Sequence, residues 1–309
     1  MMKYTLVSIF KTAWKLAAEG YSDCDAEYRR KQQWKIFFCI MPNPSFAFDW
    51  FEFIKSPRFE HISSNRPRLY VKPFRPYISI KWTKQQKVKA ILDTYKFLET
   101  EKAAFKQILI RDEGILLHKI TFENTFEGFI RLRYDDTLRK EGELTLSFEC
   151  TQLGGRISSV AFSLVEQKPG YWVCLIGCIQ GHKNKNVQHA FKFTQKLLHG
   201  LRPNSLVIYA TQELMRSIGC KEIHCVGNSI HISRRRNVIN LPWKKNKTFD
   251  YNQCWIEIGG ENINKDWFKI PLTPIRKDIV EVQSNKRSMY NKRYRMLDQL
   301  SLEAFNRNF

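Results

Sequence analysis

Five short segments rich in β-branched and aromatic residues follow one another from about residue 113 to residue 180, and they constrain the fold more than any other feature. Paired glycines, a Lys-Pro-Gly turn or charged residues separate them. In the third segment, Leu144, Leu146 and Phe148 alternate with Thr145 and Ser147, which is the two-residue period of a half-buried strand. The pattern predicts an antiparallel meander of up to five strands. The segments are ILLHKITF, EGFIRLRY, ELTLSFEC, RISSVAFSLV and YWVCLIGCI.

Helices and strands alternate after the meander. One amphipathic helix ends at Gly200 and Pro203, and a second ends at Gly219. A strand at KEIHCVG follows, then a helix capped by Asp250 with Gln253 three residues later, and another strand at DWFKIPL. The segment KRSMYNKRYRMLDQLSLEAF predicts a basic amphipathic helix. The order indicates an α+β fold, an antiparallel meander followed by alternating helices and strands, and it is compatible with a GNAT-type acyltransferase.

The first part of the chain differs in character from the rest. It is aromatic-rich, and we expect a helical N-terminal region, residues 1–112, packed on an α+β domain of residues 113–309. Leu6, Phe10, Ala13, Trp14 and Ala17 share one helical face, which predicts an amphipathic helix rather than a signal peptide. No stretch of about 18 apolar residues occurs, so no membrane span is expected and the chain is predicted to be cytoplasmic.

Most of the eight cysteines lie in or beside apolar segments, where a free thiol behaves as a small hydrophobic group. The spacings Cys174 to Cys178 and Cys220 to Cys225 are not those of a CxxC pair, and no second half of a zinc site follows. We therefore expect structural free thiols in a reducing compartment and no metal site.

The chain is strongly basic, with a formal net charge of +21 and a pI of about 9.7. This excess favours anionic partners: nucleic acid, an acidic lipid surface or a phosphorylated ligand. Basic segments with interleaved aromatic residues, at 66–82 and 286–295, are compatible with RNA binding through phosphate contacts and stacking. A solvated basic surface is the alternative, and no RNA-binding signature decides between the two.

The stretch WVCLIGCIQGHKNKN, residues 172–186, joins the meander to the first helix. A GNAT enzyme holds the pyrophosphate of acyl-coenzyme A at this position, because the N–H groups and dipole at a helix start bind anions. The sequence departs from the usual Gln/Arg-x-x-Gly-x-Gly/Ala pattern, since Gly181 follows Gln180 directly and bulky residues come next. A plain structural connection and a site for another anion are the alternatives. The candidate cofactor residues are Gln180, Gly181, His182, Lys183, Asn184 and Lys185.

Catalytic candidates are few. The sequences HExxH, Gly-x-Ser-x-Gly, Walker A and the Rossmann fingerprint are absent. Glu149, or the pair Cys178 and His182, is the candidate base or nucleophile near the opening of the sheet. A structural role in the sheet is the alternative for each of them.

The second half of the chain resembles the VirK/YbjX family of bacterial proteins. Spaced blocks carry the resemblance in the family's order, from about residue 113 to residue 302. Gly227 stands where the family often has Ser, Asn252 replaces the usual Asp, and Cys254 replaces the usual Phe. The main blocks are LHGLRP at 198–203, a strand block with Val226, Asn228 and His231, YNQCWIEIGG at 251–260 and KRSMYNKRYRMLD at 286–298.

The resemblance implies a biological setting rather than a chemical activity. The family is associated with bacterial virulence, through expression or surface presentation of an outer-membrane virulence factor and through resistance to antimicrobial peptides. It supplies no agreed catalytic residues. Three hypotheses follow: an accessory protein with a GNAT-like acyltransferase activity that uses acyl-coenzyme A, an RNA-binding post-transcriptional regulator, and a noncatalytic chaperone or adaptor for an envelope protein.

Overall fold

The computed structural model describes residues 6–100, 103–110, 113–122, 126–181, 187–234 and 249–300. The chain forms two compact units. The first comprises the residues up to Tyr77 together with Trp82–Val88, and the second comprises Ile78–Lys81 and the residues from Lys89 onwards. Helix α5 (Lys84–Thr100) therefore begins in the first unit and continues in the second.

The first unit is helical, and aromatic side chains form much of its interior. Asn43 caps α3 by accepting a hydrogen bond from the Phe46 backbone N–H, and proline at the first position of α3 needs no donor there. The Trp50 indole N–H donates to the Tyr70 carbonyl oxygen at 2.9 Å. The elements are α1 (Leu6–Gly20), α2 (Ala26–Ile40), α3 (Pro44–Ile54), α4 (Glu60–Asn65) and the 3-10 helix η1 (Leu69–Phe74).

Helix α1 confirms the predicted N-terminal amphipathic helix, but the buried face is rotated from the predicted one. Ile9, Ala13 and Leu16 are buried, whereas Leu6 is 58% exposed. Trp14 packs edge-on against an aromatic residue of α2 at 5.2 Å between ring centroids. The predicted helical periodicity is confirmed. Packing against α2 determines which residues on that side of α1 are buried.

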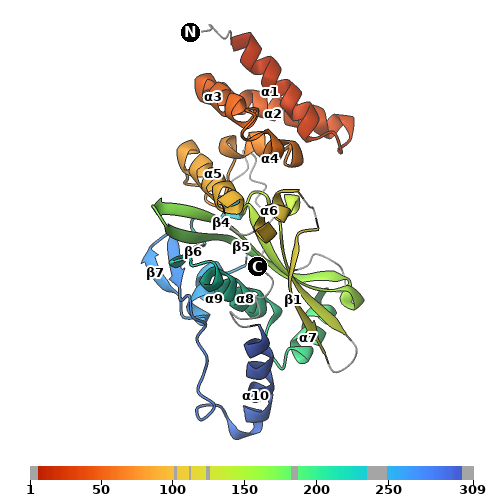
Figure 1. The fold of residues 1–309 in the computed structure, drawn as a ribbon, viewed down its shortest axis with the longest axis vertical. Coiled ribbons are helices and arrows are strands. Elements are labelled where there is room, and N and C mark those ends of the chain that lie inside the picture. The colour runs from red at the N-terminus through yellow and green to blue at the C-terminus, as the bar shows by residue number, and fades with distance from the viewer. Residues whose placement is uncertain are drawn as a thin grey trace, which may run out of the picture. The chain divides into compact units, whose positions relative to one another are not determined.

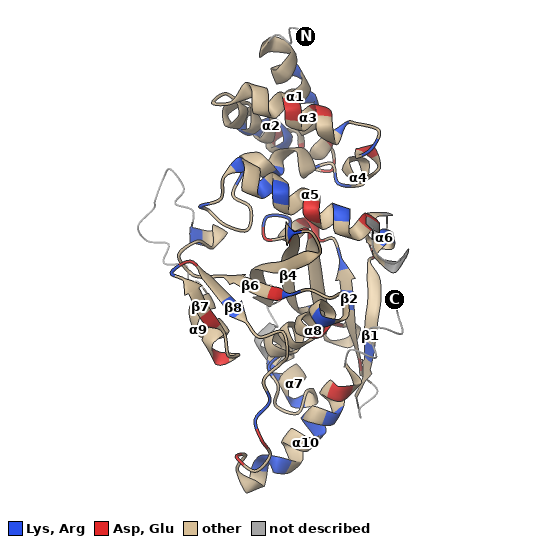
Figure 2. Cartoon of the chain, turned by 60° about the vertical axis from the view of Figure 1, so that its left-hand side comes forward, with Lys and Arg blue, Asp and Glu red and all other residues tan. Residues whose placement is uncertain are grey.

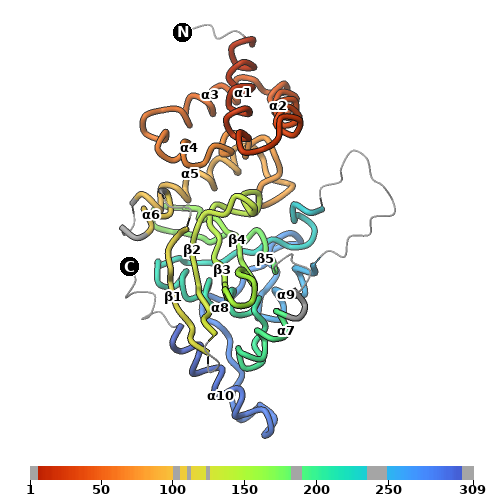
Figure 3. Tube along the Cα trace, turned by 90° about the vertical axis from the view of Figure 1, so that its right-hand side faces the viewer, coloured from red at the N-terminus to blue at the C-terminus, as the bar shows by residue number. Residues whose placement is uncertain are grey.

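The second unit is built on a mixed sheet of eight strands within the described chain (Figure 1). The strand order is β1-β2-β3-β4-β5-β6-β8-β7, and all neighbours are antiparallel except β5 and β6. Strands β1 to β5 form the predicted meander, whose first four strands lie side by side in Figure 3. The strands are β1 (Ile115–Thr121), β2 (Glu127–Arg133), β3 (Leu144–Cys150), β4 (Gly155–Lys168), β5 (Tyr171–Gly181), β6 (Glu222–Val226), β7 (Glu261–Asn264) and β8 (Trp267–Ile270).

Helices α7 (Val187–Leu197) and α8 (Pro203–Ser217) connect β5 to β6, and α8 packs on one face of the sheet (Figure 1). Leu146, Phe148, Val160, Phe162 and Ile176 are fully buried on this face. Each such side chain contributes about 1.5–3 kcal/mol when it leaves water. The sheet and α8 therefore share the main core.

The connection between β2 and β3 covers the opposite face of the sheet, where small polar side chains are buried. The Glu143 backbone N–H donates to the Phe162 carbonyl oxygen, and an Arg156–Asp135 ion pair closes the other end of the connection. The Thr94 hydroxyl of α5 bonds both backbone groups of a β4 residue. The short helices of this region are α6 (Ala103–Ile110), η2 (Asp136–Leu138) and η3 (Thr151–Leu153).

The C-terminal part adds η4 (Ile232–Arg234), α9 (Tyr251–Glu257) and α10 (Ser284–Gln299). Asp250 caps α9 by accepting from the Gln253 backbone N–H, which confirms the predicted helix start. Strand β7 was not predicted, because all four of its residues are exposed and it has no apolar period.

All eight cysteines are free, as expected. Among the described residues, no group of side chains is arranged to hold a metal ion. None of the helices in the described ranges is long and apolar enough to cross a membrane.

Candidate functional site

Strands β5 and β6 part from each other inside the sheet. Their parallel pairing runs from Val173 opposite Glu222 to Ile176 opposite Cys225 and then stops. Strand β5 continues to Gly181, paired only with β4 on its other side. The chain after β6 turns toward β8 instead, where the Gly227 backbone N–H donates to a carbonyl oxygen at 2.8 Å. The backbone of residues 177–181 is thus a strand edge without a neighbouring strand; we call it the freed edge of β5.

Two aromatic rings lie against the freed edge. The rings of His231 and Tyr251 stack with 4.3 Å between their centroids and 27° between their planes, and both are at least 94% buried. The Tyr251 hydroxyl donates to the Ile179 carbonyl oxygen at 3.4 Å. Asn228 fixes the start of α9, because its side chain accepts from the Tyr251 backbone N–H and donates to Asp250. The turn after β6 and helix α9 therefore hold the two rings together.

The hydrogen bonds of His231 define its tautomer. The Ser233 backbone N–H donates to Nδ1 at 3.2 Å, so the neutral ring carries its proton on Nε2. Nε2 is buried and has no hydrogen-bond partner among the described residues. Burial lowers the pKa of His231 to about 4, assisted by Arg234 and opposed by the Gly177 carbonyl. The ring is consequently neutral at pH 7, and its Nε2–H lies near the Gly177 carbonyl of the freed edge without forming a hydrogen bond of regular geometry.

Tyr251 has the complementary shift. Burial, and then the proximity of the Cys178 thiol and the Glu141 carboxylate, raise the pKa of its phenol well above the usual range. The phenol is therefore protonated at pH 7 and keeps its O–H as a hydrogen-bond donor. Both shifts arise first from burial, and both keep the side chains neutral at pH 7.

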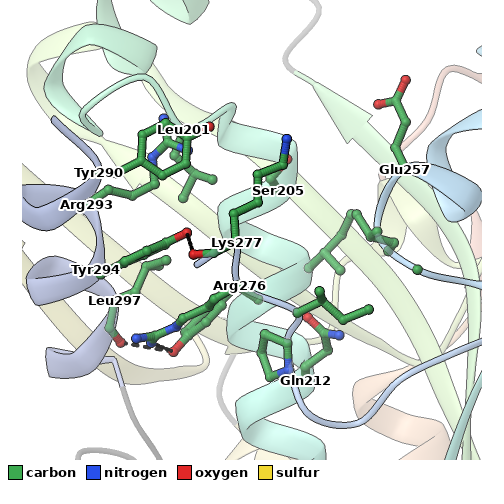
Figure 4. Close-up of a pocket in the computed structure, with 16 residues that line it drawn as sticks. Leu201, Ser205, Gln212, Glu257, Arg276, Lys277, Tyr290, Arg293, Tyr294 and Leu297 are labelled. Carbon is green, nitrogen blue, oxygen red and sulfur yellow. Dashed lines mark hydrogen bonds between the residues drawn. The ribbon is translucent and has the colours of Figure 1, made fainter. Parts of the chain in front are cut away.

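A second feature is a groove of about 350 Å³ between α8, the end of α9, the segment 271–283 and α10 (Figure 4). Volumes of this order accommodate a small ligand or a headgroup. Apolar side chains of α8 and α10 line it, together with cationic and phenolic groups and the Glu257 carboxylate. We call it the α8–α10 groove. The wall residues are Tyr209, Arg276, Lys277, Tyr290, Arg293 and Tyr294.

The groove walls are held in place by internal hydrogen bonds. Arg293 donates through Nε and Nη2 to the His199 carbonyl oxygen, at 3.1 and 2.8 Å, and lies 4.1 Å from the centre of the Tyr290 ring. The Tyr294 hydroxyl donates to the Lys277 carbonyl oxygen at 3.0 Å, as the dashed line in Figure 4 shows. These bonds tie α10 both to the loop before α8 and to the segment that precedes α10.

Comparison with known proteins places the chain in a family. A family model described as a protein of unknown function (DUF535) matches residues 25–305. The chain belongs to this family. It is 28% identical to the uncharacterized protein YbjX of Escherichia coli K12 over 273 residues, which is 88% of this chain and 82% of YbjX. It is also 33% identical over 132 residues to an uncharacterized protein of Haemophilus influenzae, which covers 42% of each chain. No solved structure matched.

The sequence blocks that carry the family resemblance come together at the freed edge of β5 and at the α8–α10 groove. Asn228 and His231 of the strand block meet Tyr251 of the next block at the freed edge. The block at 198–203, the end of the block at 251–260 and the block at 286–298 line the α8–α10 groove. The family resemblance marked these residues as motif positions without a chemical role. Their contacts join segments far apart in the chain, so the sequence alone did not bring them together.

Of the predicted catalytic residues, Glu149 lies elsewhere on the sheet, whereas Cys178 belongs to the freed edge of β5. Glu149 on β3 accepts from Arg133 at 2.5 Å and from Ser147 at 2.7 Å, so its carboxylate is engaged within the sheet. Cys178 on β5 is fully buried, and burial raises its pKa well above the usual range. A thiol that stays protonated is a poor nucleophile. The surroundings of both residues favour structural roles, and the catalytic assignments stay predictions.

The predicted cofactor residues are only partly described. Gln180 and Gly181 form the last two positions of β5 and pair with Ser159 and Ser158 of β4. His182, Lys183, Asn184 and Lys185 lie outside the described residues. The two described positions belong to the freed edge, immediately before the segment that leads to α7.

The buried neutral His231 predicts a pH dependence of stability. Its pKa is about 4 in the folded chain and about 6.5 when unfolded, so between these values the unfolded state binds more protons. Stability is therefore full above pH 6.5 and falls by on the order of 3 kcal/mol as the pH drops to 4. Urea unfolding at several pH values measures this. The variant His231→Gln should give a flatter profile, whereas replacing the exposed His61 by Gln should leave it unchanged. Equal slopes for all three proteins would contradict the assignment.

Proposed function

We propose that the second unit is an acyltransferase of the GNAT type, which moves an acyl group from a thioester such as acyl-coenzyme A to a nucleophilic acceptor. One observation carries the proposal: β5 pairs with β6 only as far as Ile176 and then runs on to Gly181. GNAT enzymes bind the acyl donor where two parallel strands part in this way. The connection from an antiparallel meander through helices into a parallel strand supports the same assignment.

His231 and Tyr251 have separate roles in the proposed reaction. The acceptor attacks the thioester carbonyl carbon, and the Nε2–H of neutral His231 donates to the oxygen on which negative charge develops. The carbon–sulfur bond then breaks, and the Tyr251 hydroxyl donates a hydrogen bond to the departing thiolate, which takes up a proton from solvent. The acceptor releases its own proton to solvent. The products are an acylated acceptor and a free thiol.

The hydrogen bonds at the freed edge are compatible with ligand binding there. The 3.4 Å separation between the Tyr251 hydroxyl and the Ile179 carbonyl oxygen is long for an O–H···O bond. The phenol can therefore exchange this acceptor for a ligand atom at small cost. His231 Nε2 gains a hydrogen-bond acceptor of regular geometry in place of its looser contact with the Gly177 carbonyl. In this proposal the segment between Gly181 and Val187 receives the pyrophosphate, although its sequence departs from the usual GNAT pattern.

An assay of thiol release tests the activity. The full chain is incubated with acetyl-coenzyme A or a longer acyl-coenzyme A and a panel of amine and hydroxyl acceptors, and free thiol is titrated. Tyr251→Phe removes the hydrogen-bond donor to the departing thiolate but keeps the ring stack, so we expect kcat to fall by about 10²-fold with little change in KM. His231→Gln should lower kcat by a similar factor.

Two controls separate activity from folding. The variant Tyr171→Phe removes a phenol hydroxyl from the start of β5, where it donates to Glu222. This variant should retain full activity. Circular dichroism and thermal unfolding check that each variant is folded. Unchanged kcat in Tyr251→Phe would refute its role as hydrogen-bond donor to the departing thiolate. The absence of both thiol release and acyl-coenzyme A binding by calorimetry would refute the proposed function.

The resemblance to the VirK/YbjX family suggests the setting of such an activity. We propose that the acceptor belongs to the bacterial envelope, since the family is associated with surface presentation of a virulence factor and with resistance to antimicrobial peptides. A deletion strain complemented with Tyr251→Phe tests this link. If Tyr251→Phe restored the function of the deletion strain as well as the unchanged chain does, the biological role would not depend on the proposed chemistry.

A further inference from the structure

We propose that the α8–α10 groove binds the phosphate headgroup of an anionic lipid in a membrane surface, and that the segment 271–283 enters the boundary between headgroups and acyl chains. The groove and the segment lie next to each other, since Ile275, Arg276 and Lys277 of that segment line the groove. This inference concerns a surface separate from the freed edge of β5, and it does not depend on the acyltransferase proposal.

The cationic groups of the groove suit a phosphate. The Lys277 ammonium is exposed and makes no ion pair or hydrogen bond with the residues that the structure describes. Arg293 is oriented by its two bonds to the His199 carbonyl, so its guanidinium stays fixed in the wall of the groove. Arg276 bonds Asp298 at 2.6 Å and the Tyr209 hydroxyl at 2.8 Å, which holds a third cation at the same site. Fixed arginines and a mobile lysine are the usual phosphate ligands of proteins.

The exposed aliphatic side chains beside the groove distinguish a lipid surface from other anionic partners. Ile275 is 69% exposed and Val280 is 76% exposed, which are large values for aliphatic side chains within a few residues of each other. An acyl-chain boundary offers these side chains an apolar environment, whereas a phosphorylated small molecule or RNA does not. RNA recognition instead uses exposed aromatic faces, and the Tyr290 and Tyr294 rings are partly buried against Arg293, Arg276 and each other.

The surface around the α8–α10 groove is positively charged, as binding to an anionic lipid requires. Residues 271–300 contain seven Lys or Arg and three Asp or Glu, a net charge of +4. Figure 2 shows the basic residues along α10. Basic side chains next to an apolar insertion segment attract a protein to anionic lipid and keep it there. The groove volume of about 350 Å³ fits a headgroup, and the apolar insertion comes from Ile275, which also lines the groove, and from Val280.

Vesicle sedimentation with the full chain tests the proposal. Vesicles of phosphatidylcholine alone are compared with vesicles that also contain phosphatidylglycerol or phosphatidic acid. We expect binding to the anionic vesicles that weakens with salt and little binding to the neutral ones. Lys277→Gln should weaken binding about fivefold. The double variant Ile275→Ser with Val280→Ser should weaken it by a similar factor with no change in charge, since both side chains are exposed and their replacement preserves the fold. Lys168→Gln, which removes a charge from the exposed turn between β4 and β5, is the matched control.

Two competition experiments distinguish a lipid headgroup from free phosphate and from RNA as the ligand of the groove. Inorganic phosphate and a single-stranded RNA are added as competitors. Lipid binding that survives both competitors and is lost in the groove and aliphatic variants supports the proposal. Three results would overturn it: no binding to anionic vesicles, vesicle binding that is equal in Lys277→Gln, the aliphatic variant and Lys168→Gln, or RNA binding that depends on Lys277 when vesicles are not bound.

Discussion

Replacing Gly177 by Ala is expected to destabilise the second unit by about 3 kcal/mol or more. A Cβ atom at this position would overlap the carbonyl oxygen of Glu141 and come within 2.8 Å of the carbonyl carbon. Both neighbours are backbone atoms of the β2–β3 connection, so neither can rotate away as a side chain could. The strand or the β2–β3 connection must shift instead, and such overpacking costs about 1–3 kcal/mol, occasionally more.

The same strand provides a matched control for this variant. A Cβ atom on Gly181 would meet only the Ile157 carbonyl oxygen, at 3.9 Å, and Gly181 is exposed. We expect Gly181→Ala to change stability by less than about 0.5 kcal/mol. Urea unfolding followed by circular dichroism measures both variants. Equal effects of the two substitutions would show that the connection between β2 and β3 does not pack on β5 as described.

The substitution Trp255→Ala is expected to cost about 3–5 kcal/mol, the usual range for a fully buried aromatic side chain. Trp255 is 0% exposed, and its indole N–H donates to the Val226 carbonyl oxygen at 2.8 Å. The substitution leaves a large cavity and also leaves that carbonyl without its partner at the end of β6. Because Trp255 joins α9 to the strand that parts from β5, its loss should also disturb the position of Tyr251.

Two measurements separate the cavity from the hydrogen bond. Trp255→Phe keeps most of the apolar volume and removes only the indole N–H, so we expect a smaller loss, about 1–3 kcal/mol. The fluorescence of the remaining tryptophans and the thermal midpoint are compared for both variants. A loss below about 1 kcal/mol for Trp255→Ala would contradict the burial of this side chain.

Local sequence patterns were sufficient for most of the secondary structure. The alternation in β3 reflects one side chain facing α8 and the next facing the β2–β3 connection, and this period is visible without the fold. Asp250 and Asn43 cap helices through contacts within three residues. Strand β7 was missed because it pairs only with β8 and buries nothing of its own.

The catalytic candidates show which properties local sequence patterns do not predict. Cys178 and Glu149 were selected for their chemical type, but burial suppresses the thiolate and an arginine of the neighbouring strand binds the carboxylate. Both effects depend on strand register and on coverage of the sheet, which no local pattern encodes. His231 and Tyr251 are 20 positions apart, and only the turn after β6 and the start of α9 bring their rings to 4.3 Å.

The sequence by itself determined the meander, the helices that follow it, the basic charge and membership of the family, because each depends on residue type and spacing along the chain. The tertiary structure decided where β5 and β6 separate, which rings lie at that edge and that three distant blocks form one groove. These features arise from contacts between segments far apart in the chain. Burial and hydrogen bonding at those contacts then set the protonation of His231 and Tyr251.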